Sequence, residues 1–474
     1  MSEVRRGSFE AWAVPRGVTL PPGEGPSFTT GGVRVHSLDV DAAWIRRLVD
    51  TLREGGEALR ARGALEVAET LGRAGARFLD PGDPLRARAL ELLPATSGLS
   101  TEMAAAVLDG MAADWTGERL SGLLERELGD VRALDGFVDG ARPGVRVHAA
   151  GPALCVQIVS GSVPGVSATA LLRSLLLKGA TLVKPGHGDR VLPVLLLEAL
   201  REEDPVVADA AAVLYWAGGR EAVEDAVLGA ADTVTVYGSD SVVRDLRNRT
   251  PVTTRFVAYH HRISLGVVGR NALRPERLHR TACAVAGAVA FFDQRGCVSP
   301  RTVYVEEAGD STPTAFAREL AVALASVEER LPGGALDAAE ASAVHQERGT
   351  AELLAAAGRG VEVHHGGEAS WTVIFDPTPD FAPSCVGRVV RVKPVSDADR
   401  VPVLVSPFAH HLQTVGVVGL GDRREELGRA LARVGVSRVA AFDAVPFPPP
   451  TWHHDGQGPL VALVRWVDLE DGDA

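Results

Sequence analysis

Apolar and polar positions divide the chain into a helical N-terminal region followed by two sets of alternating strands and helices. Residues 40 to about 130 carry Ala, Leu, Arg and Glu at helical spacing. One helix in this region is expected to begin at "DPLRARALELL", with Asp83 as its N-cap and Pro84 at its first helical position. The region therefore predicts helical packing and carries no recognisable chemistry.

From about residue 146, short apolar runs alternate with helical patterns. Buried strands are expected at "ALCVQIVS", "ATLVKP", "AAVLYWAGG" and "DTVTVYGS", and one or two more at "FVAYHHRISLGVVG". The segments between them, such as "VSATALLRSLLLKG", repeat apolar residues at helical spacing. This alternation predicts a parallel α/β sheet covered on both faces. Ligands bind beyond the carboxyl ends of such strands, so "SGSVPG", "KPGHGD" and "YGSDS" are the turns of interest.

A second alternating set begins near residue 276. Its first helix, "PERLHRTACAVAGAVAFF", runs directly into "DQRGCVSP", and the strands "RTVYVEE" and "SWTVIFD" follow with a long helix between them. "PFPPPTWHHDGQGP" predicts an extended segment, and "LVALVRWVDLE" a closing strand. We therefore expect three domains: residues 1–260 with the helical region and a nucleotide-binding domain of Rossmann type, residues 261–445 with Cys297, and residues 446–474 as a C-terminal segment and oligomerisation strand.

Composition narrows the class of protein. The 474 residues are 46% hydrophobic and 23% charged, as in ordinary globular proteins, and a net charge of −12 argues against a nucleic-acid partner. Four cysteines are too few for a disulfide framework and match no zinc spacing, which favours a reducing cytoplasm. The N-terminus has no secretory h-region. The uncharged run Ala149–Leu172 is interrupted by "SGSVPG", so it predicts a strand, a turn and a helix, and no membrane span.

Cys297 is the candidate nucleophile. It lies in a Gly/Ser/Pro turn between an apolar helix and a β-branched strand, a setting that exposes a side chain. A nearby cation such as Arg295 would favour the reactive thiolate. The alternative is a small buried residue, the common fate of a free cysteine. Cys155 lies in an apolar strand and Cys283 in a helix, so both are expected to be packing residues. The role of Cys385 in "APSCVGR" is ambiguous.

Four other residues are candidate ligand contacts. Ser162 is a short polar side chain that can stabilise an oxyanion, or else a simple turn residue. Lys184 ends a strand at the edge expected for a cofactor, or is a solvated lysine. Gly238 and Ser239 end a strand and open a helix, where phosphate binds well, although many α/β proteins share this pairing.

Four His-His pairs occur, at 260/261, 364/365, 410/411 and 453/454. Neighbours on a strand point to opposite faces, so a pair does not easily bind one metal, and we expect no metal site. His261 or His410 is a candidate general acid, with a structural or surface role as the alternative. "GVVGLGDRREELG" has only a loose glycine pattern.

Taken together, these segments resemble the aldehyde dehydrogenase superfamily, and more closely the acyl-CoA (fatty-acyl) reductase family of bacterial luminescence. The resemblance is carried by "FDQRGCVSP", "SGSVPGVSATALLRSLLLKGATLVKPGHGD", "VYGSDS" and "HHRISLGVVG". It covers about residues 146–474 in the order and rough spacing of its parts. It implies an aldehyde dehydrogenase-like α/β fold, in which a Rossmann-type cofactor domain accompanies an α/β catalytic domain.

The resemblance also implies roles for single residues. Cys297 would accept an acyl group from a thioester, and NADPH would deliver hydride so that an aldehyde leaves; NADH is possible. Ser162 stands where aldehyde dehydrogenases place an oxyanion-binding asparagine. Lys184 matches their ribose-contacting lysine, and Gly238 with Ser239 matches their pyrophosphate turn.

Departures from the pattern refine this expectation. No acidic residue occurs between Pro251 and Pro275, where aldehyde dehydrogenases carry a glutamate base, so water would be poorly activated against an acyl-enzyme. The glutamate that holds the nicotinamide ribose is also missing from "RVVRVKPV". His187 stands where a glutamate would disfavour a 2′-phosphate, so NADPH is permitted. Ser162 is shorter than asparagine.

The sequence therefore predicts a reductase that converts an acyl thioester, bound to CoA, a carrier protein or an acyl-protein synthetase, to an aldehyde. Two alternatives stay open: an aldehyde dehydrogenase running toward the acid, and a non-reducing acyl-transfer or acyl-binding module. A homo-oligomer is expected, because the terminal strand has no partner nearby in sequence.

Overall fold

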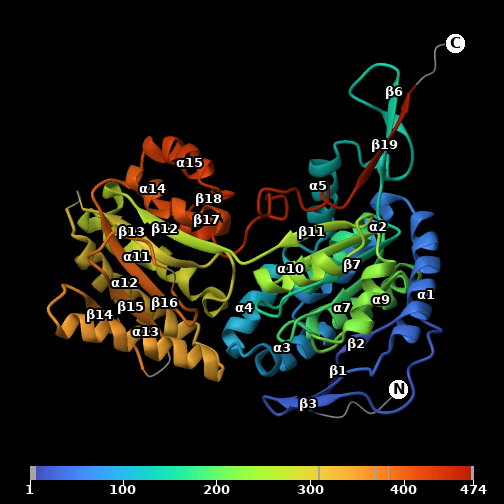
Figure 1. The fold of residues 1–474 in the computed structure, drawn as a ribbon, viewed down its shortest axis with the longest axis horizontal. Helices are drawn as coiled ribbons and strands as arrows, with labels where there is room; N and C mark the ends of the chain where they lie inside the picture. Colours follow the sequence, from blue (N-terminus) through green and yellow to red (C-terminus); the bar gives the residue numbers. More distant parts are fainter. Residues whose placement is uncertain (1–6, 308–309, 368–369, 383, 471–474) are drawn as a thin grey trace. The chain divides into compact units, whose positions relative to one another are not determined.

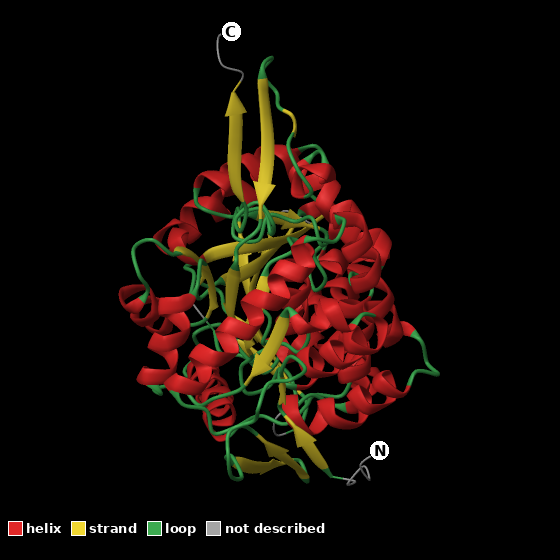
Figure 2. Ribbon diagram, turned by 90° about the vertical axis from the view of Figure 1, so that its right-hand side faces the viewer, coloured by secondary structure: helices red, strands yellow, loops and turns green. Residues whose placement is uncertain are grey.

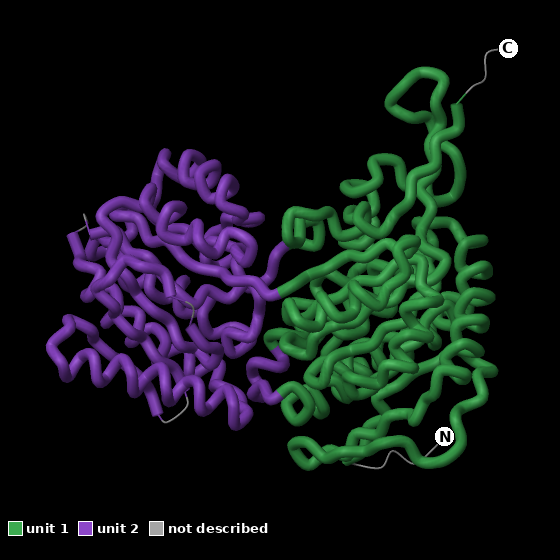
Figure 3. The backbone as a smooth tube through the Cα atoms, viewed as in Figure 1, with its two compact units in different colours: residues 1–97, 106–260, 449–474 green, residues 98–105, 261–448 purple. Residues whose placement is uncertain are grey.

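The computed structural model describes residues 7–307, 310–367, 370–382 and 384–470, so the outermost residues of the predicted first and last domains lie outside it. The chain forms two compact units (Figure 3). The first comprises residues 1–97, 106–260 and 449–474, and the second residues 98–105 and 261–448.

The first unit is built on a six-stranded sheet (Figure 1). Its strand order is β11-β10-β7-β8-β9-β2, parallel except for β2. Its strands are β2 (Trp12–Ala13), β7 (Leu154–Ile158), β8 (Ala180–Lys184), β9 (Ala211–Leu214), β10 (Thr233–Tyr237) and β11 (Arg255–Tyr259). The predicted parallel α/β sheet is thus present.

Helices cover both faces of this sheet. One face packs on α1 (Ala42–Arg60), α9 (Glu221–Ala230) and α10 (Asp240–Arg249), and the other on α6 (Val166–Leu176) and α7 (Val191–Glu203). The remaining helices are α2 (Ala64–Ala76), α3 (Pro84–Ser97), α5 (Gly117–Leu128) and α8 (Pro205–Asp209), while α4 (Thr101–Ala112) contributes to both units. Asp83 accepts a hydrogen bond from the Leu85 N–H at 2.8 Å, as expected of the residue that opens α3.

The sequence of α1 explains both where the helix begins and which of its faces is buried. The Asp41 carboxylate accepts from Trp44 N–H at 2.7 Å and so caps the helix. Trp44, Leu48 and Leu52 repeat at four-residue spacing and are buried against the sheet. Burial of one such side chain contributes roughly 1.5–3 kcal/mol, so this face anchors the helical N-terminal region to the sheet.

Two small sheets complete the first unit. One, before the helical region, has the order β1-β4-β3 and consists of β1 (Ser8–Glu10), β3 (Ser27–Thr30) and β4 (Val33–His36). The other has the order β19-β6-β5 and consists of β5 (Val138–Asp139), β6 (Val145–Ala150) and β19 (Arg465–Glu470). In Figures 1 and 2, β6 and β19 extend together away from the helices of this unit.

The closing strand differs from the expectation in two ways. It begins at Arg465, because residues 459–463 form a turn in which the Glu127 carboxylate accepts from the N–H groups of Leu460 and Val461, at 3.2 Å each. Its partner, β6, lies in the same chain. The strand is thus paired within its own chain, with a partner distant in sequence, so it gives no support to an oligomer, and the homo-oligomer stays a prediction.

The run Ala149–Leu172 contains β7, a turn and the start of α6, as predicted. Among the helices that the structure describes, none has the length and apolar character needed to cross a bilayer.

The second unit has a seven-stranded sheet in the order β14-β15-β16-β13-β12-β17-β18, parallel except for β14. Its strands are β12 (Ile263–Val268), β13 (Pro300–Glu306), β14 (Glu362–His365), β15 (Thr372–Phe375), β16 (Val389–Val395), β17 (Leu412–Val418) and β18 (Arg438–Ala440). Its helices are α11 (Pro275–Ala290), α12 (Pro313–Arg330), α13 (Ala338–Ala356), α14 (Val401–Val405) and α15 (Arg423–Arg433).

A buried carboxylate ties together the carboxyl ends of four central strands of this sheet. Glu306 ends β13 and is fully buried. It accepts from the Arg423 guanidinium at 2.5 and 2.9 Å, from the Arg270 N–H at 2.6 Å and from the Ala398 N–H at 2.9 Å. These donors follow β17, β12 and β16. Burial opposes ionisation of Glu306, but the hydrogen bonds outweigh it and lower its pKa to about 2.

We predict that Glu306→Gln lowers the free energy of unfolding by about 3 kcal/mol at pH 7, because two arginines lose their buried acceptor. Since the folded-state pKa lies below the unfolded value, this contribution is complete above about pH 4.5 and is lost as the pH falls toward 2. Urea unfolding of both proteins between pH 8 and 3 measures it. A difference that stays constant down to pH 3 would contradict the assignment.

Candidate active site

Cys297 lies in a turn between α11 and β13, at the amino end of β13. It is exposed, whereas Cys155 is buried and Cys283 and Cys385 are half-buried. The backbone reaches it from α11 through a short turn at Phe291–Gln294. The structure therefore presents this cysteine on the surface of the second unit.

The turn before Cys297 has an unusual backbone. Phe292, Asp293 and Gln294 have φ angles of 59°, 49° and 63°, in the left-handed region that favours glycine. Each such residue costs roughly 1–2 kcal/mol. Three in succession persist only where the surroundings hold them, and such strain is concentrated at functional sites.

Buried side chains of the turn supply that support. The Gln294 amide nitrogen donates to the carbonyls of Pro300 and Val389 at 2.9 and 2.8 Å, and its oxygen accepts from Val389 N–H at 3.0 Å. Asp293 accepts from the Arg388 guanidinium at 2.8 and 3.0 Å and from Gly334 N–H at 3.1 Å. The turn is thereby joined to β13 and to the start of β16.

The Arg388 side chain is itself fixed by burial and by further hydrogen bonds. Only 1% of its side chain is exposed, and it also donates to Glu328 at 2.7 Å and to the Leu331 carbonyl at 2.8 Å. A buried arginine with all these acceptors fixes the position of Asp293. Residues distant in sequence from Cys297 therefore determine the conformation of its turn.

The sheet fixes the backbone of Cys297 itself. The Ser264 hydroxyl on β12 donates to the Cys297 carbonyl at 2.6 Å and accepts from Thr414 N–H on β17 at 3.2 Å. Thr414 is the register partner of Arg438 on β18. Cys297 is thus bound through Ser264 to the part of the sheet that carries Arg438.

Two arginines near Cys297 differ in their partners. Arg295, the expected cation, donates to Glu340 at 2.8 and 3.0 Å and forms an ion pair with Asp293 at 3.8 Å, so its charge is compensated. Arg438 donates to the Val445 carbonyl at 3.0 Å. Burial lowers the pKa of Arg438 to about 10, and its electrostatic interaction with Cys297 opposes that shift. Through this interaction we expect Arg438 to favour the thiolate form of Cys297.

His261 lies three residues before Ser264, at the amino end of β12, and its side chain is exposed. Because Ser264 pairs with Pro300, His261 and Cys297 approach the same end of two neighbouring parallel strands. Its ring lies 5.9 Å from the ring of His411. The alternative, His410, accepts a hydrogen bond from Arg262 at its carbonyl, at 3.0 Å. The acid role of His261 stays a prediction.

In the first unit, the predicted oxyanion residue Ser162 and the predicted cofactor residues Lys184 and Gly238 gather at the carboxyl edge of the sheet. Ser162 is exposed in the loop after β7, Lys184 is the last residue of β8, and Gly238 follows β10. Parallel neighbours place these ends at one edge, as the sequence analysis expected. Burial lowers the pKa of Lys184, and Glu224 partly opposes this.

Three glycines let two of these loops touch. A Cβ atom on Gly161 would meet the backbone of Gly188, and one on Gly186 would meet the backbone of Gly161. The buried Asp189 accepts from the N–H groups of Gly165 and Ser167 at 2.7 and 2.6 Å and so joins the loop after β8 to the start of α6. The loops that carry Ser162 and His187 are therefore packed backbone against backbone.

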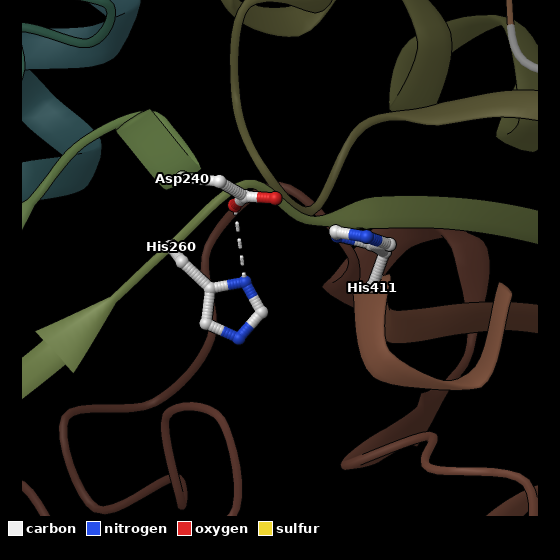
Figure 4. A group of neighbouring side chains, drawn as sticks. All are labelled: Asp240, His260 and His411. Carbon is white, nitrogen blue, oxygen red and sulfur yellow. Dashed lines mark ion pairs between the residues drawn. The ribbon is translucent and has the colours of Figure 1, made fainter. Parts of the chain in front are cut away.

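The turn after β10 opens α10. Ser239 is its N-cap, accepting from Val242 N–H at 3.5 Å, and a Cβ atom on Gly238 would crowd Val242. Asp240, the first residue of α10, forms an ion pair with His260 at 3.6 Å (Figure 4). The N–H groups at this helix start are suited to an anion such as pyrophosphate.

Beyond Lys184, His187 contributes to an aromatic cluster that sequence analysis missed in part. The His187 ring lies 5.1 Å from Phe28 on β3 and 6.4 Å from Tyr215 after β9. Burial, and then the charge of Arg190, lower the pKa of His187. The sequence analysis named His187 but neither Tyr215 nor Arg190, and no local pattern connects Phe28 with them.

We predict that Asp293→Asn lowers the free energy of unfolding by about 3 kcal/mol, because the buried Arg388 loses a charged acceptor. The strained turn then relaxes and no longer holds Cys297 at the surface. Alkylation of Cys297 by iodoacetamide therefore becomes slower, as measured by intact-protein mass. Glu329→Gln, an exposed change on α12, is the matched control and should alter neither quantity. Wild-type stability and alkylation rate in Asp293→Asn would contradict this account of the turn.

Comparison with known proteins identifies the family of this chain. The model of the family "Acyl-CoA reductase (LuxC)" matches residues 65–466. A long-chain acyl-protein thioester reductase of Aliivibrio fischeri is 26% identical over 351 residues, which cover 73% of this chain and 70% of that protein. One of Photobacterium phosphoreum is 24% identical over 387 residues, covering 79% and 74%.

Solved structures agree on the fold. An NADP-dependent enzyme of E. coli superposes with a TM-score of 0.77 at 16% identity and covers 98% of both chains. An aldehyde dehydrogenase of Brucella melitensis superposes with a TM-score of 0.75 at 14% identity, covering 97% of this chain and 96% of its own. The predicted aldehyde dehydrogenase-like fold is confirmed, and the match over most of the chain shows that it belongs to the acyl-CoA reductase (LuxC) family.

Proposed function

We propose that this protein reduces a long-chain acyl thioester to an aldehyde, with Cys297 as the residue that carries the acyl group and NADPH as the reductant. The family and the names of its relatives support the reaction. The observation that carries the proposal is an exposed cysteine on a strained turn that buried side chains hold in place. Strain maintained by a buried network is otherwise difficult to explain.

The proposed chemistry has two parts. The Cys297 thiolate attacks the carbonyl carbon of the donor thioester; a new carbon–sulfur bond forms, and the donor thiol leaves as its thiolate. When bound, NADPH supplies a hydride to the acyl carbon. The bond to Cys297 then breaks, the aldehyde leaves, and the sulfur keeps the electron pair as a thiolate. No water enters this sequence.

The chain's own residues prepare Cys297 for attack. Ser264 fixes its carbonyl, the turn at Phe292–Gln294 fixes its direction, and the charge of Arg438 favours the thiolate. Ser162 and backbone N–H groups are the proposed oxyanion donors. His261 is the proposed general acid, available to a leaving thiol.

The residue content near β11 and β12 supports reduction over oxidation. No acidic residue lies between Pro251 and Pro275. Hydrolysis of an acyl-enzyme requires a base that activates water, whereas exchange between thioesters does not, since a thiolate leaves easily. The chain therefore combines the proposed nucleophile, Cys297, with the absence of the base that acid formation requires.

The first unit fits a nicotinamide dinucleotide. Its carboxyl edge offers the half-buried Lys184 for a ribose, and Gly238 with Ser239 at the start of α10 for the pyrophosphate. The guanidinium nitrogens of Arg190 at this edge are buried and have no acceptor among the described residues. His187 replaces an acid that would repel a 2′-phosphate. These features favour NADPH over NADH.

We predict that wild-type protein mixed with a long-chain acyl-CoA gains the mass of one acyl group, and that added NADPH removes it as aldehyde. Cys297→Ala should gain no mass, and Cys283→Ala, which removes a half-buried cysteine of α11, should behave as wild type. Intact-protein mass spectrometry, with an aldehyde assay, measures both steps.

Other outcomes separate the alternatives. An adduct that NADPH leaves in place would favour an acyl-transfer module, and release as free acid would favour an oxidising dehydrogenase. An adduct that persists in Cys297→Ala would contradict the assignment of the nucleophile. Where acyl-CoA gives no adduct, the same measurement with an acylated carrier protein tests the other donor class.

A further inference from the structure

Arg190 is a buried cation whose guanidinium has no hydrogen-bond partner among the residues that the structure describes. It immediately precedes α7, and its exposed fraction is 0%. All three guanidinium nitrogens are buried, and none has an acceptor among the described residues. Arginine carries five N–H donors and stays charged, so leaving them unsatisfied in a protein interior is costly.

Aromatic rings surround this guanidinium. Its central carbon lies 4.0 Å from the ring centre of Phe28 and 4.6 Å from that of Tyr215. Cation–π contacts with both rings offset part of the cost of desolvating the guanidinium. They do not replace hydrogen bonds in the plane of the guanidinium, where its N–H groups point.

The neighbouring carboxylate, Asp189, already accepts hydrogen bonds from other groups. Asp189 precedes Arg190, but its two oxygens accept from the backbone of Gly165 and Ser167. Burial lowers the pKa of Arg190 to about 10, which still leaves it charged at neutral pH. Arg190 therefore keeps its positive charge in this cluster, and its guanidinium forms no hydrogen bond with the adjacent Asp189.

The position of Arg190 indicates which anion it serves. It stands at the N-terminus of the 13-residue helix α7, where backbone N–H groups and the helix dipole favour phosphate. The strand that leads to it ends at Lys184, whose ammonium lies 5.8 Å from the Tyr215 ring centre. A ribose held by Lys184 therefore brings its substituents near Arg190.

We propose that Arg190 recognises a phosphate monoester on an adenosine ribose, namely the 2′-phosphate of NADPH, together with the N-terminus of α7. This inference rests on the proposed function, since it assumes that the carboxyl edge of this sheet holds the coenzyme. Arginine suits the role because its planar fork binds two phosphate oxygens at once.

Phe28 and Tyr215 are both half-buried, and Phe28 is the ring that we expect a bound phosphate to displace. Phe28 is half-buried and lies on β3, an outer strand of the small sheet β1-β4-β3; of the other β3 side chains, Ser27 and Thr29 are exposed. Tyr215, in contrast, directly follows a fully buried strand of the main sheet. Phosphate binding therefore displaces the Phe28 ring and exchanges one cation–π contact for charge-assisted hydrogen bonds.

Binding of nucleotide fragments to the full-length protein tests the proposal. Isothermal titration compares 2′,5′-ADP, which carries the NADPH phosphate, with 3′,5′-ADP, which carries that of CoA, and with 5′-AMP. Wild type should bind 2′,5′-ADP at least about tenfold more tightly than either of the others, as expected for one charged phosphate contact. Arg190→Met should lose this preference while its affinity for 5′-AMP stays unchanged.

Two further variants keep the result interpretable. Arg190→Lys retains the charge without the fork and should retain part of the preference. Arg201→Met changes an arginine near the other end of α7, which donates to the Val14 carbonyl, and should leave all three affinities unchanged. A thermal melt shows that each variant is folded; Arg190→Met should melt no lower than wild type, because an unsatisfied buried charge is removed.

The contrary outcomes are distinct. An undiminished preference for 2′,5′-ADP in folded Arg190→Met would overturn the proposal and leave Arg190 as an anchor for Phe28. A wild-type preference for 3′,5′-ADP would overturn the assignment to NADPH in favour of CoA. A wild type that binds none of the three would overturn the proposed function along with it, whereas equal binding of all three would overturn the role of Arg190 alone.

Discussion

The contact between Asp293 and Arg388 is the constraint on which the second unit's candidate site depends. It holds a turn of three residues in a backbone region that their side chains disfavour, with Gln294 bonded to β13 and β16 beside it. The strain costs several kcal/mol. The buried charge pair stabilises the turn only because the other donors of Arg388 also have acceptors. The exposed position of Cys297 thus depends on the hydrogen bonds and the ion pair of the buried side chains in the turn before it.

The two units place their candidate residues by different means. In the first, the carboxyl ends of parallel strands bring Lys184, Gly238 and Ser162 to one edge, and close glycine contacts hold the loops. In the second, Cys297 and His261 stand at the amino ends of β13 and β12. The ligand rule for parallel sheets therefore locates the proposed coenzyme residues and does not locate the nucleophile.

Local patterns predicted what depends on neighbours in sequence. Alternation of apolar runs identified the parallel sheets, and a Gly/Ser/Pro turn identified Cys297 as exposed. The supporting residues were missed because they act at a distance: Arg388 lies 95 residues from Asp293. Phe28 reaches Arg190 from a strand that no periodicity suggested. Arg295, the nearby cation expected for Cys297, is bound to Glu340, and Arg438, which the sequence analysis did not name, interacts electrostatically with Cys297.

The most direct test of Cys297 as the acyl carrier is a single turnover on isolated acyl-protein. The protein is acylated with a long-chain acyl-CoA, freed of CoA by gel filtration and mixed with NADPH, and coenzyme fluorescence is followed together with aldehyde. The account predicts that one NADPH is oxidised and one aldehyde is formed for each acylated Cys297, with the free thiol restored. Acyl groups that stay on the protein, or leave without oxidation of NADPH, would contradict it.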